Sequence, residues 1–499
     1  MPAALTTSAT DTSADRRRWM ALAVVCLAQL MIVLDSTIVN VALPSIQREL
    51  RFSQGDLTWV IDAFLVTFGS FLLLAGRLGD LFGRRRVFLA GVTLFTAASV
   101  LCGIAPSAGA LIAARFVQGI GAAVQASVIL AIIVTEFPAP AERARAMSGY
   151  VFVAVAGGSL GLLCGGALTA ALSWHWIFFV NLPIGIATVL LGRALIPRDV
   201  TLAGPRHIDW VGSVLVTTSL MIGIYAIVQA TAHGWLSAQV LGFGTLAAAL
   251  MLAFGLVEAR SPDPIVPLRI LQLRGLISSS VVRGFLVTGM YSTFFLGTLY
   301  LEHVRHFTAL QTGLAFLPWT LTVAALSLGI TARVVERLGA IRVLVPGMIV
   351  VAGGLTLLTA AGPHTSFFPT VFLAFFAIGL GIGVAFMPLL TIAMADVPAA
   401  DAGLGSGLVN VSQQISGALG LAVLGTIATN RTHASLVAHH ALDGALVDGY
   451  HLAFTIASIC VCAGVLVALV VLRGPRSAVS EPALAADELD SVDVLRQAA

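Results

Sequence analysis

Three ionisable residues, Asp35, Asp62 and Arg115, stand inside long apolar stretches of the chain. Charged side chains at membrane depth are rare, and they are functional candidates by default. Burial favours the neutral form of a carboxyl group, whereas a nearby Arg favours its charged form. A carboxylate whose Arg partner moves can therefore take up and release a proton. These residue types predict proton-coupling chemistry.

The three residues share one expected depth. Asp35 lies about six residues before the outer end of its predicted helix, and Asp62 and Arg115 lie about six residues after the outer starts of theirs, which at about 1.5 Å per residue puts all three roughly 9 Å below the outer boundary. We therefore expect them to cluster. A purely structural ion pair is the alternative for Asp35, and a side chain that reaches the helix end is the alternative for Asp62. For Arg115, structural pairing and coupling are compatible.

Membrane-spanning helices must hold these residues, and the composition predicts them. Hydrophobic residues make up 58% of the 499 positions and charged residues 10%, against roughly 45–50% and 25% in soluble domains. The mean hydropathy is +0.98. A bilayer core needs about 20 apolar residues per helix. About fourteen segments satisfy this requirement, at roughly 19–41, 56–75, 87–105, 109–134, 145–169, 175–195, 210–230, 237–257, 276–300, 312–332, 342–361, 367–392, 403–427 and 450–472.

The distribution of Arg sets the expected orientation, because cytoplasmic loops carry an excess of basic residues. Clusters such as Arg16–Arg18 and Arg84–Arg86 fall on one side of the predicted helices. We expect a multi-pass protein of the plasma (inner) membrane with both termini in the cytoplasm. The predicted organisation is a cytoplasmic segment, a six-helix bundle, a linker with two additional helices, a second six-helix bundle and a disordered acidic tail, at 1–18, 19–195, 196–275, 276–472 and 473–499.

Several function classes are excluded or disfavoured. The chain has no Lys, so it cannot form the G-x-x-x-x-G-K-[ST] loop of many ATPases, and we expect a proton gradient to drive it without a bound cofactor. No polar catalytic constellation indicates an enzyme. The pair His303 and His306 lacks further metal-ligand spacing and is interpreted as a solvated loop. Arg283 is interpreted as a side chain that reaches the cytoplasmic interface.

A charged loop occurs twice. GRLGDLFGRRRV begins at Gly76, and ARVVERLGAIRV begins 256 residues later. Both copies lie between the second and third predicted helices of a group of six. The matching pairs are Arg77 and Arg333, Asp80 and Glu336, Gly83 and Gly339, and Arg86 and Arg342. Parallel repeats of six helices around a central cavity are a standard transporter architecture.

Four stretches carry a resemblance to a known family. They are Leu34–Pro44, Gly76–Arg86, Arg115–Ala123 and Ser173–Gly185. Together they resemble the motifs of the major facilitator superfamily, in particular its fourteen-helix drug:proton antiporter group, and the resemblance covers nearly all of 19–472. It implies an all-α polytopic membrane protein with the major facilitator fold, which is two six-helix bundles plus two extra central helices.

The resemblance also implies roles for particular residues. A cytoplasmic gate motif would consist of Gly76, Asp80, Gly83, Arg84, Arg85 and Arg86, and its repeat of Glu336, Gly339 and Arg342. Asp80 would stabilise one conformation of the gate. The chain departs from the family at Leu81, where a basic residue is usual, and at Leu162, where the antiporter motif usually has Pro.

Glycines accumulate on the fifth predicted helix, at Gly149, Gly157, Gly158, Gly161, Gly165 and Gly166. All but Gly157 fit the antiporter motif. Gly157, Gly161 and Gly165 recur every four residues, so they share one helix face, which lets a second helix approach closely. Generic packing of membrane helices is the alternative to a specific gating contact.

These observations predict a proton-coupled exporter of small lipophilic or cationic compounds that works by alternating access. The alternatives are an uptake symporter or facilitator on the same fold, or an exporter of one endogenous metabolite. The expected partners are a small-molecule substrate, protons and the lipid bilayer, with no nucleic acid. We expect a monomer, with room for an unidentified adaptor protein.

Overall fold

A computed structural model describes residues 9–52, 57–198, 209–261, 264–327, 329–438 and 441–472. Every regular element within these residues is helical, which confirms the all-α fold class. The predicted tail, the first eight residues and most of the predicted linker before residue 209 lie outside the described residues.

The helices fall into two groups of six spans joined by an additional pair. The first group comprises α1 (Ala9–Leu50), α3 (Trp59–Phe82), α4 (Arg84–Gly103), α5 (Ala108–Glu136), α6 (Pro140–Ala171), the short α7 (Trp176–Phe179) and α8 (Asn181–Leu195). The additional pair is α9 (Trp210–His233) and α10 (Ala238–Glu258), followed by the short α11 (Leu268–Leu271). The second group comprises α12 (Arg274–Leu299), η1 (Tyr300–Val304), α13 (Ala309–Ala315), α14 (Leu317–Ser327), α15 (Ile330–Leu338), α16 (Ala340–Leu358), η2 (Phe367–Val371), α17 (Phe372–Ala395), η3 (Ala399–Asp401), α18 (Ala402–Val437) and α19 (Leu442–Val471).

Twelve helices in the described part of the chain are long and apolar enough to cross a membrane, and the number rises to 14 if each of two bent pairs is one span. One pair is α6, bent by 42° between Gly158 and Leu163, and the other is α14 with α15, bent by 57°. Each predicted segment falls on one of these helices or pairs. The segments predicted for α1 and α18 are shorter than the helices. Hydropathy marks only the apolar part of a helix, whereas its backbone hydrogen bonding continues into the polar ends.

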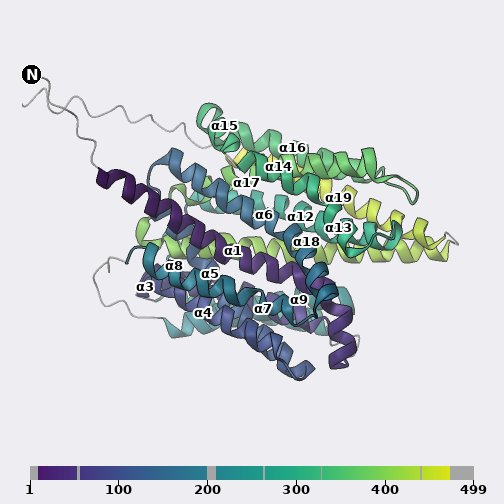
Figure 1. Cartoon of the computed structure of the whole chain (residues 1–499), viewed down its shortest axis with the longest axis horizontal. Coiled ribbons are helices and arrows are strands. Elements are labelled where there is room, and N and C mark those ends of the chain that lie inside the picture. The colour runs from purple at the N-terminus through teal and green to yellow at the C-terminus, as the bar shows by residue number, and fades with distance from the viewer. Residues whose placement is uncertain are drawn as a thin grey trace, which may run out of the picture.

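The two groups form two bundles that lie side by side (Figure 1). In that view α4, α5 and α8 lie in the lower bundle and α14, α16 and α17 in the upper one, while α6 and α18 run along the junction. Helix α9 packs against both α3 of the first bundle and α18 of the second. The additional pair therefore lies beside the junction of the bundles.

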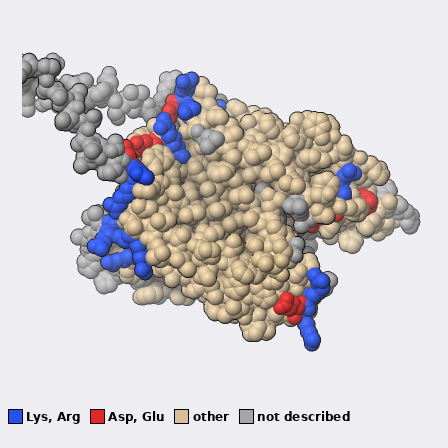
Figure 2. Space-filling view, in the orientation of Figure 1, with Lys and Arg blue, Asp and Glu red and all other residues tan. Residues whose placement is uncertain are grey.

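Charged side chains gather at the two ends of the long axis and leave a broad uncharged band between them (Figure 2). The end at which α1 begins and α3 meets α4 carries Arg16–Arg18 and Arg84–Arg86, and we call it the Arg-rich end. Arg48, Arg305 and Arg431 lie toward the opposite end. The uncharged band matches a protein surface that faces lipid hydrocarbon.

The repeated loop has the same backbone in both copies. Gly83 and Gly339 have φ angles of 97° and 85°, which side-chain-bearing residues rarely adopt. The N–H of Gly83 donates to the carbonyl of Gly79 at 3.1 Å, and that of Gly339 donates to the carbonyl of Val335 at 2.8 Å. In each copy a new helix then begins at once. The duplicated sequence therefore folds as a duplicated helix–turn–helix.

Candidate functional site

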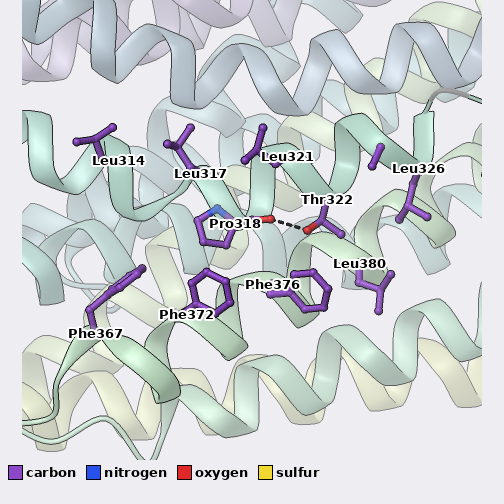
Figure 3. A pocket seen from close by; sticks show the side chains of 11 residues that line it. Leu314, Leu317, Pro318, Leu321, Thr322, Leu326, Phe367, Phe372, Phe376 and Leu380 are labelled. Atoms are coloured by element: carbon purple, nitrogen blue, oxygen red, sulfur yellow. Dashed lines mark hydrogen bonds between the residues drawn. The ribbon is translucent and has the colours of Figure 1, made fainter.

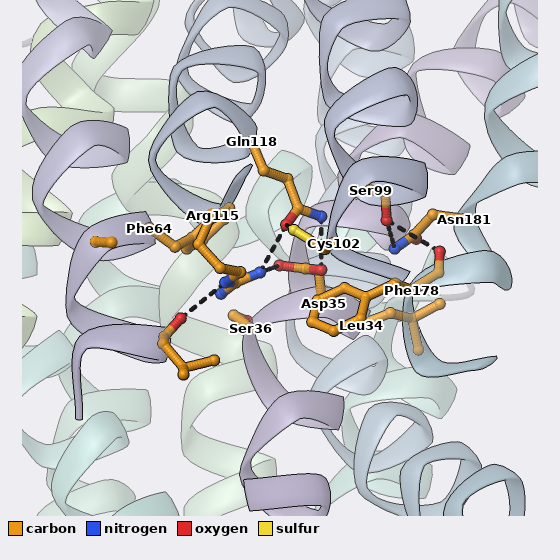
Figure 4. Close-up of polar contacts among 12 residues, drawn as sticks. Leu34, Asp35, Ser36, Phe64, Ser99, Cys102, Arg115, Gln118, Phe178 and Asn181 are labelled. Carbon is orange, nitrogen blue, oxygen red and sulfur yellow. Dashed lines mark hydrogen bonds and ion pairs between the residues drawn. The ribbon is translucent and has the colours of Figure 1, made fainter. Parts of the chain in front are cut away.

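Asp35 of α1 and Arg115 of α5 form an ion pair inside the first bundle, where their side chains are 0% and 1% exposed. Gln118, one helical turn after Arg115, bridges them. Its Nε2 donates to Asp35 Oδ1 at 2.8 Å, and its Oε1 accepts from Arg115 Nη1 at 2.8 Å. Figure 4 shows the three side chains pointing toward one another from two helices. The structure therefore brings Asp35 and Arg115 together, as their shared depth predicts.

Further contacts hold the Arg115 guanidinium in place. Its Nε donates to the carbonyl of Val60 at 2.8 Å, and its centre lies 4.4 Å from the ring centroid of Phe64. The thiol of Cys102 donates to Gln118 Oε1 at 3.4 Å. A buried ion pair is stable only where additional hydrogen bonds satisfy its remaining polar atoms. This arrangement meets that condition through Gln118, the Val60 carbonyl and the Phe64 ring.

A second polar contact lies beside the ion pair. Asn181 of α8 donates from Nδ2 to Ser99 Oγ at 3.1 Å, and Ser99 donates to the carbonyl of Phe178 at 2.9 Å (Figure 4). The Phe178 ring centroid is 5.9 Å from the Arg115 guanidinium. Sequence reasoning missed Gln118, Ser99 and Asn181 as site residues. The signal for Gln118 was its spacing of three residues from Arg115, which puts both on one helix face.

Asp62 does not join this cluster in the described residues. It lies one turn into α3, is half-buried and accepts a hydrogen bond from the hydroxyl of Thr58. The expectation of a three-residue cluster is therefore wrong for Asp62. Depth along the membrane normal follows from sequence spacing, but the direction in which a side chain points around its helix depends on how that helix packs.

The glycine face of α6 packs against α1 next to the ion pair. A Cβ added at Gly157 would lie 3.0 Å from Val33, and one added at Gly165 would lie 2.9 Å from the carbonyl oxygen of Ile38. Gly161 faces Thr37, which follows Asp35 by two residues. The three glycines thus share one face, as predicted. The part of α1 that carries Asp35 is therefore in direct contact with α6.

The other glycines of α6 differ in their surroundings. Gly158 faces the other bundle, where an added Cβ would lie 3.2 Å from Phe294 of α12. An added Cβ would reach only Leu22, at 4.0 Å, from Gly149 and would meet nothing within 4 Å at Gly166. The side chain of Leu162 lies outside the described residues.

At the Arg-rich end, the first bundle is fastened to the second through Asp80. Its two carboxylate oxygens accept hydrogen bonds from the backbone N–H groups of Gly403 and Leu404, each at 2.8 Å. These N–H groups open α18 and have no partner within their own helix. Arg84 lies 3.3 Å from Asp80 Oδ1. The side chain of Asp80 is 0% exposed, so this carboxylate caps a helix of the opposite bundle.

Close backbone contact accompanies this cap. The carbonyl oxygen of Gly403 lies 2.5 Å from where a Cβ at Gly76 would stand, and the reverse contact has the same length. No side chain fits at either position while the helices are this close. Gly76 therefore permits the close approach of α3 to α18 at the Arg-rich end.

A second ion cluster at this end was not predicted. Asp401, the residue before α18, is 1% exposed and lies 2.8 Å from Arg269 and 3.6 Å from Arg77. Arg77 also donates to the carbonyl of Pro264 at 3.3 Å. The signal was weak, since these partners come from three distant parts of the sequence. These contacts connect the first bundle, the segment after α10 and the start of α18 to one another.

The remaining charges of the two loops lie near the surface. Arg85 donates to the carbonyl of Arg193, and Arg86 is exposed. In the second copy Glu336 and Arg342 are both exposed, and among the described residues Glu336 makes no hydrogen bond or ion pair. The duplicated loops therefore share a backbone, but only the first copy uses its acidic residue to cap a helix.

Arg283 of α12 contradicts its sequence interpretation. Its side chain does not reach the interface but is buried, with 2% of the residue exposed. It donates to Gln413 Oε1 of α18, and its guanidinium centre lies 5.2 Å from the ring centroid of Phe386. The sequence position alone is compatible with either orientation, because rotation of α12 decides whether the side chain points to lipid or to the protein interior.

A groove of about 640 Å³ lies away from these charges, between α14 and α17 (Figure 3). Leu314, Pro318, Leu321, Phe372 and Phe376 are among its lining residues, and no charged residue lines it. Leu321 and Phe376 are exposed. The groove therefore offers an apolar, outward-facing surface and no group for proton chemistry.

Comparison with known proteins agrees with this architecture. The model of the Major Facilitator Superfamily matches residues 25–421. The puromycin resistance protein of Streptomyces alboniger is 39% identical over 96% of this chain and 95% of its own length. The cephamycin export protein of Amycolatopsis lactamdurans is 34% identical over 84% of this chain and 87% of its own. The tetracenomycin C resistance and export protein of Streptomyces glaucescens is 30% identical over 83% and 77%.

Solved structures share the fold at low sequence identity. A human organic anion transporter superposes with a TM-score of 0.65 at 17% identity, over 90% of this chain and 99% of its own. A proton:xylose symporter does so with a TM-score of 0.60 at 14% identity, over 89% and 95%. Fold, repeated loop and family model agree: this multi-pass membrane protein belongs to the major facilitator superfamily.

Proposed function

We propose that this transporter exports small lipophilic or cationic compounds in exchange for protons, by alternating access across the plasma membrane. The resistance and export proteins that resemble it over most of its length support export. The buried pair of Asp35 and Arg115 is the observation that carries proton coupling, because a carboxylate with a movable Arg partner can alternate between charged and neutral forms. The proton gradient is the proposed driving force, with no bound cofactor.

The orientation follows from the Arg-rich end, which we assign to the cytoplasm. Both termini would then be cytoplasmic, and the contact of Asp80 with α18 supports a gate that is closed on that side. A proton from the outer side would neutralise Asp35 and remove its attraction for Arg115. We propose that the chain acts as a monomer.

A physical route connects the ion pair to the junction of the bundles. Loss of the pair loosens α1 from α5, and α1 packs against the glycine face of α6. Helix α6 also packs against α13, α14 and α17 of the second bundle. Neutralising Asp35 therefore changes the packing of the helix that lies between the two bundles. This coupling would favour opening toward the cytoplasm, where substrate enters and the proton leaves.

Everted membrane vesicles test the proposal with the full-length chain and a neutral fluorescent probe, N-phenyl-1-naphthylamine. With the lumen acidified, the wild-type chain should accumulate the probe, and this accumulation should lower the pH gradient. Asp35→Asn should abolish gradient-driven accumulation, because the side chain can no longer bind a proton, whereas downhill probe exchange should remain measurable.

Two control variants sharpen the experiment. Asp35→Glu keeps a carboxyl group and should retain part of the activity. Asp62→Asn changes an acid of the same depth that is outside the ion pair, and it should leave coupling to protons in place. Gradient-driven accumulation by Asp35→Asn at the wild-type rate would refute coupling through Asp35. Probe movement that follows the proton flux would instead identify a symporter.

A further inference from the structure

Arg283 is a buried cation with unused hydrogen-bond donors. It lies nine residues after Arg274, so at about 1.5 Å per residue it is roughly 13 Å along α12. Only one of its nitrogens, Nη2, donates to a protein acceptor, which is Gln413 Oε1. Nε and Nη1 are buried and have no partner in the described residues. Two nitrogens, which together carry three N–H groups, are therefore without an acceptor at this depth.

No carboxylate balances this charge within the described residues. The neighbours of Arg283 are the hydroxyl groups of Tyr150 and Tyr291, the amide of Gln413 and the ring of Phe386. These neutral groups stabilise a cation more weakly than an anionic partner would. Burying an unpaired charge is unfavourable, and such a group is retained at functional sites where a partner arrives from outside. An anionic or strongly polarised oxygen has the matching chemistry.

Arg283 is buried where the two bundles meet. Arg283 and Gln413 belong to the second bundle, whereas Tyr150 belongs to α6 of the first. In transporters of this architecture, access alternates at the junction between the bundles. When the bundles separate at either end, the free donors of Arg283 face the space that opens.

An aromatic surface continues along the same face of α12. Phe294 follows Arg283 by eleven residues, so about three turns of helix separate them at 3.6 residues per turn. The Phe294 ring stacks on Phe316 with centroids 4.9 Å apart, and it lies 4.7 Å from Trp319. Trp319 is buried, and its Nε1 donor has no partner in the described part of the chain. The strip thus carries oxygen-binding donors at one end and stacked rings at the other.

We propose that Arg283 is a substrate-binding residue that recognises a phenolate, enolate, carboxylate or similar oxygen on an aromatic compound whose rings lie along the face of α12 toward Phe294. This proposal rests on the proposed export function and extends its substrate class to acidic aromatic compounds. Bidentate recognition by a guanidinium explains why Arg, with its fork of N–H groups, stands at this position.

Two probes that share one ring skeleton test the proposal. 1-Anilinonaphthalene-8-sulfonate carries an anionic group, and N-phenyl-1-naphthylamine is its neutral counterpart. Their dissociation constants are measured by fluorescence titration of the purified full-length chain in detergent, after subtraction of protein-free micelles. Since a buried charge-assisted hydrogen bond contributes enough to change affinity roughly tenfold, Arg283→Met should weaken binding of the anionic probe by about that factor. The neutral probe should change by less than about twofold.

A second variant keeps the test decisive if Arg283→Met folds poorly. Gln413→Glu leaves Arg283 in place but gives it a permanent anionic partner, so the anionic probe should again lose its preference. Arg283→Lys retains a charge and should keep part of the preference. Phe294→Leu should weaken both probes together, because it removes a ring that both would contact.

The outcomes separate this proposal from the proposed export function. Equal weakening of both probes by Arg283→Met, or unchanged binding of the anionic probe, would overturn the binding role of Arg283. Neither result bears on vesicle transport of the neutral probe. Conversely, a chain that binds the anionic probe through Arg283 but moves no probe in vesicles would refute export and leave the binding site standing.

Discussion

Among the described residues, each bundle buries one arginine, and the arginine of the first bundle is the one paired with a carboxylate. Arg115 is paired with Asp35 and also donates to Gln118 and a backbone carbonyl. Arg283 has one amide acceptor and two nitrogens without a partner in the described structure. The same residue type therefore serves two purposes. The first arginine pairs with a carboxylate of the protein itself, and the second, in the proposal above, pairs with an anionic group of the substrate.

The largest expected effect is on stability after Arg115→Met. This change leaves the Asp35 carboxylate buried without its partner, which should cost about 3–5 kcal/mol. Thermal unfolding in detergent, followed by tryptophan fluorescence, should show a clearly lower midpoint. The double variant Asp35→Asn with Arg115→Met removes both charges and should recover much of the loss. If Arg115→Met alone were as stable as the wild type, the contrast between a paired Arg115 and an unpaired Arg283 would not hold.

A smaller change of opposite sign is expected for Arg283→Met. Removing a buried cation that lacks an anionic partner should leave stability unchanged or raise it by up to about 2 kcal/mol. The same thermal assay measures it beside Arg115→Met. Destabilisation as large as that of Arg115→Met would mean that Arg283 is fully compensated within the protein, and the two sites would then be alike.

A modest loss of stability is expected for Gln118→Leu. Asp35 keeps its ion pair with Arg115 but loses one amide hydrogen bond, which should cost about 1–2 kcal/mol. Gln125→Leu is a matched control in the same helix, because the side-chain amide of Gln125 is buried without a partner in the described residues. It should be neutral or stabilising. A Gln118 variant that unfolds like this control would show that the bridge adds nothing to the ion pair.

The sequence predicts the helical fold and the depth of its charges well. Hydropathy locates each span, and spacing places Asp35 and Arg115 at one level, where the structure pairs them. The failures concern direction around the helix axis. Asp62 accepts a hydrogen bond from Thr58 instead of joining the ion pair, and Arg283 points inward although a side chain at its position can also reach the interface. Helix rotation is set by packing partners that lie far away in the chain.

Contacts between the bundles likewise cannot be predicted from the spacing of residues in the sequence. The resemblance to a known family implies that Asp80 acts at a gate, but its partners Gly403 and Leu404 lie more than 300 residues away. Asp401 has no motif of its own, and only the fold brings it to Arg77 and Arg269. The duplicated loop also predicts equivalent roles for Asp80 and Glu336. The surroundings of the two acids differ, and so do their contacts.

The unequal use of these two acids has a kinetic consequence. If the Arg-rich end opens during transport as we propose, each cycle breaks the cap that Asp80 forms on α18 and then restores it, so the strength of the cap adds to the barrier for opening that end. Glu336, which lies in the second copy of the loop at the same end, adds no equivalent contact. An empty transporter should therefore rest with the Arg-rich end shut, and its return to that state should be the faster step. Weakening the cap would reduce this preference for the closed Arg-rich end and increase the uncoupled leak of protons or substrate.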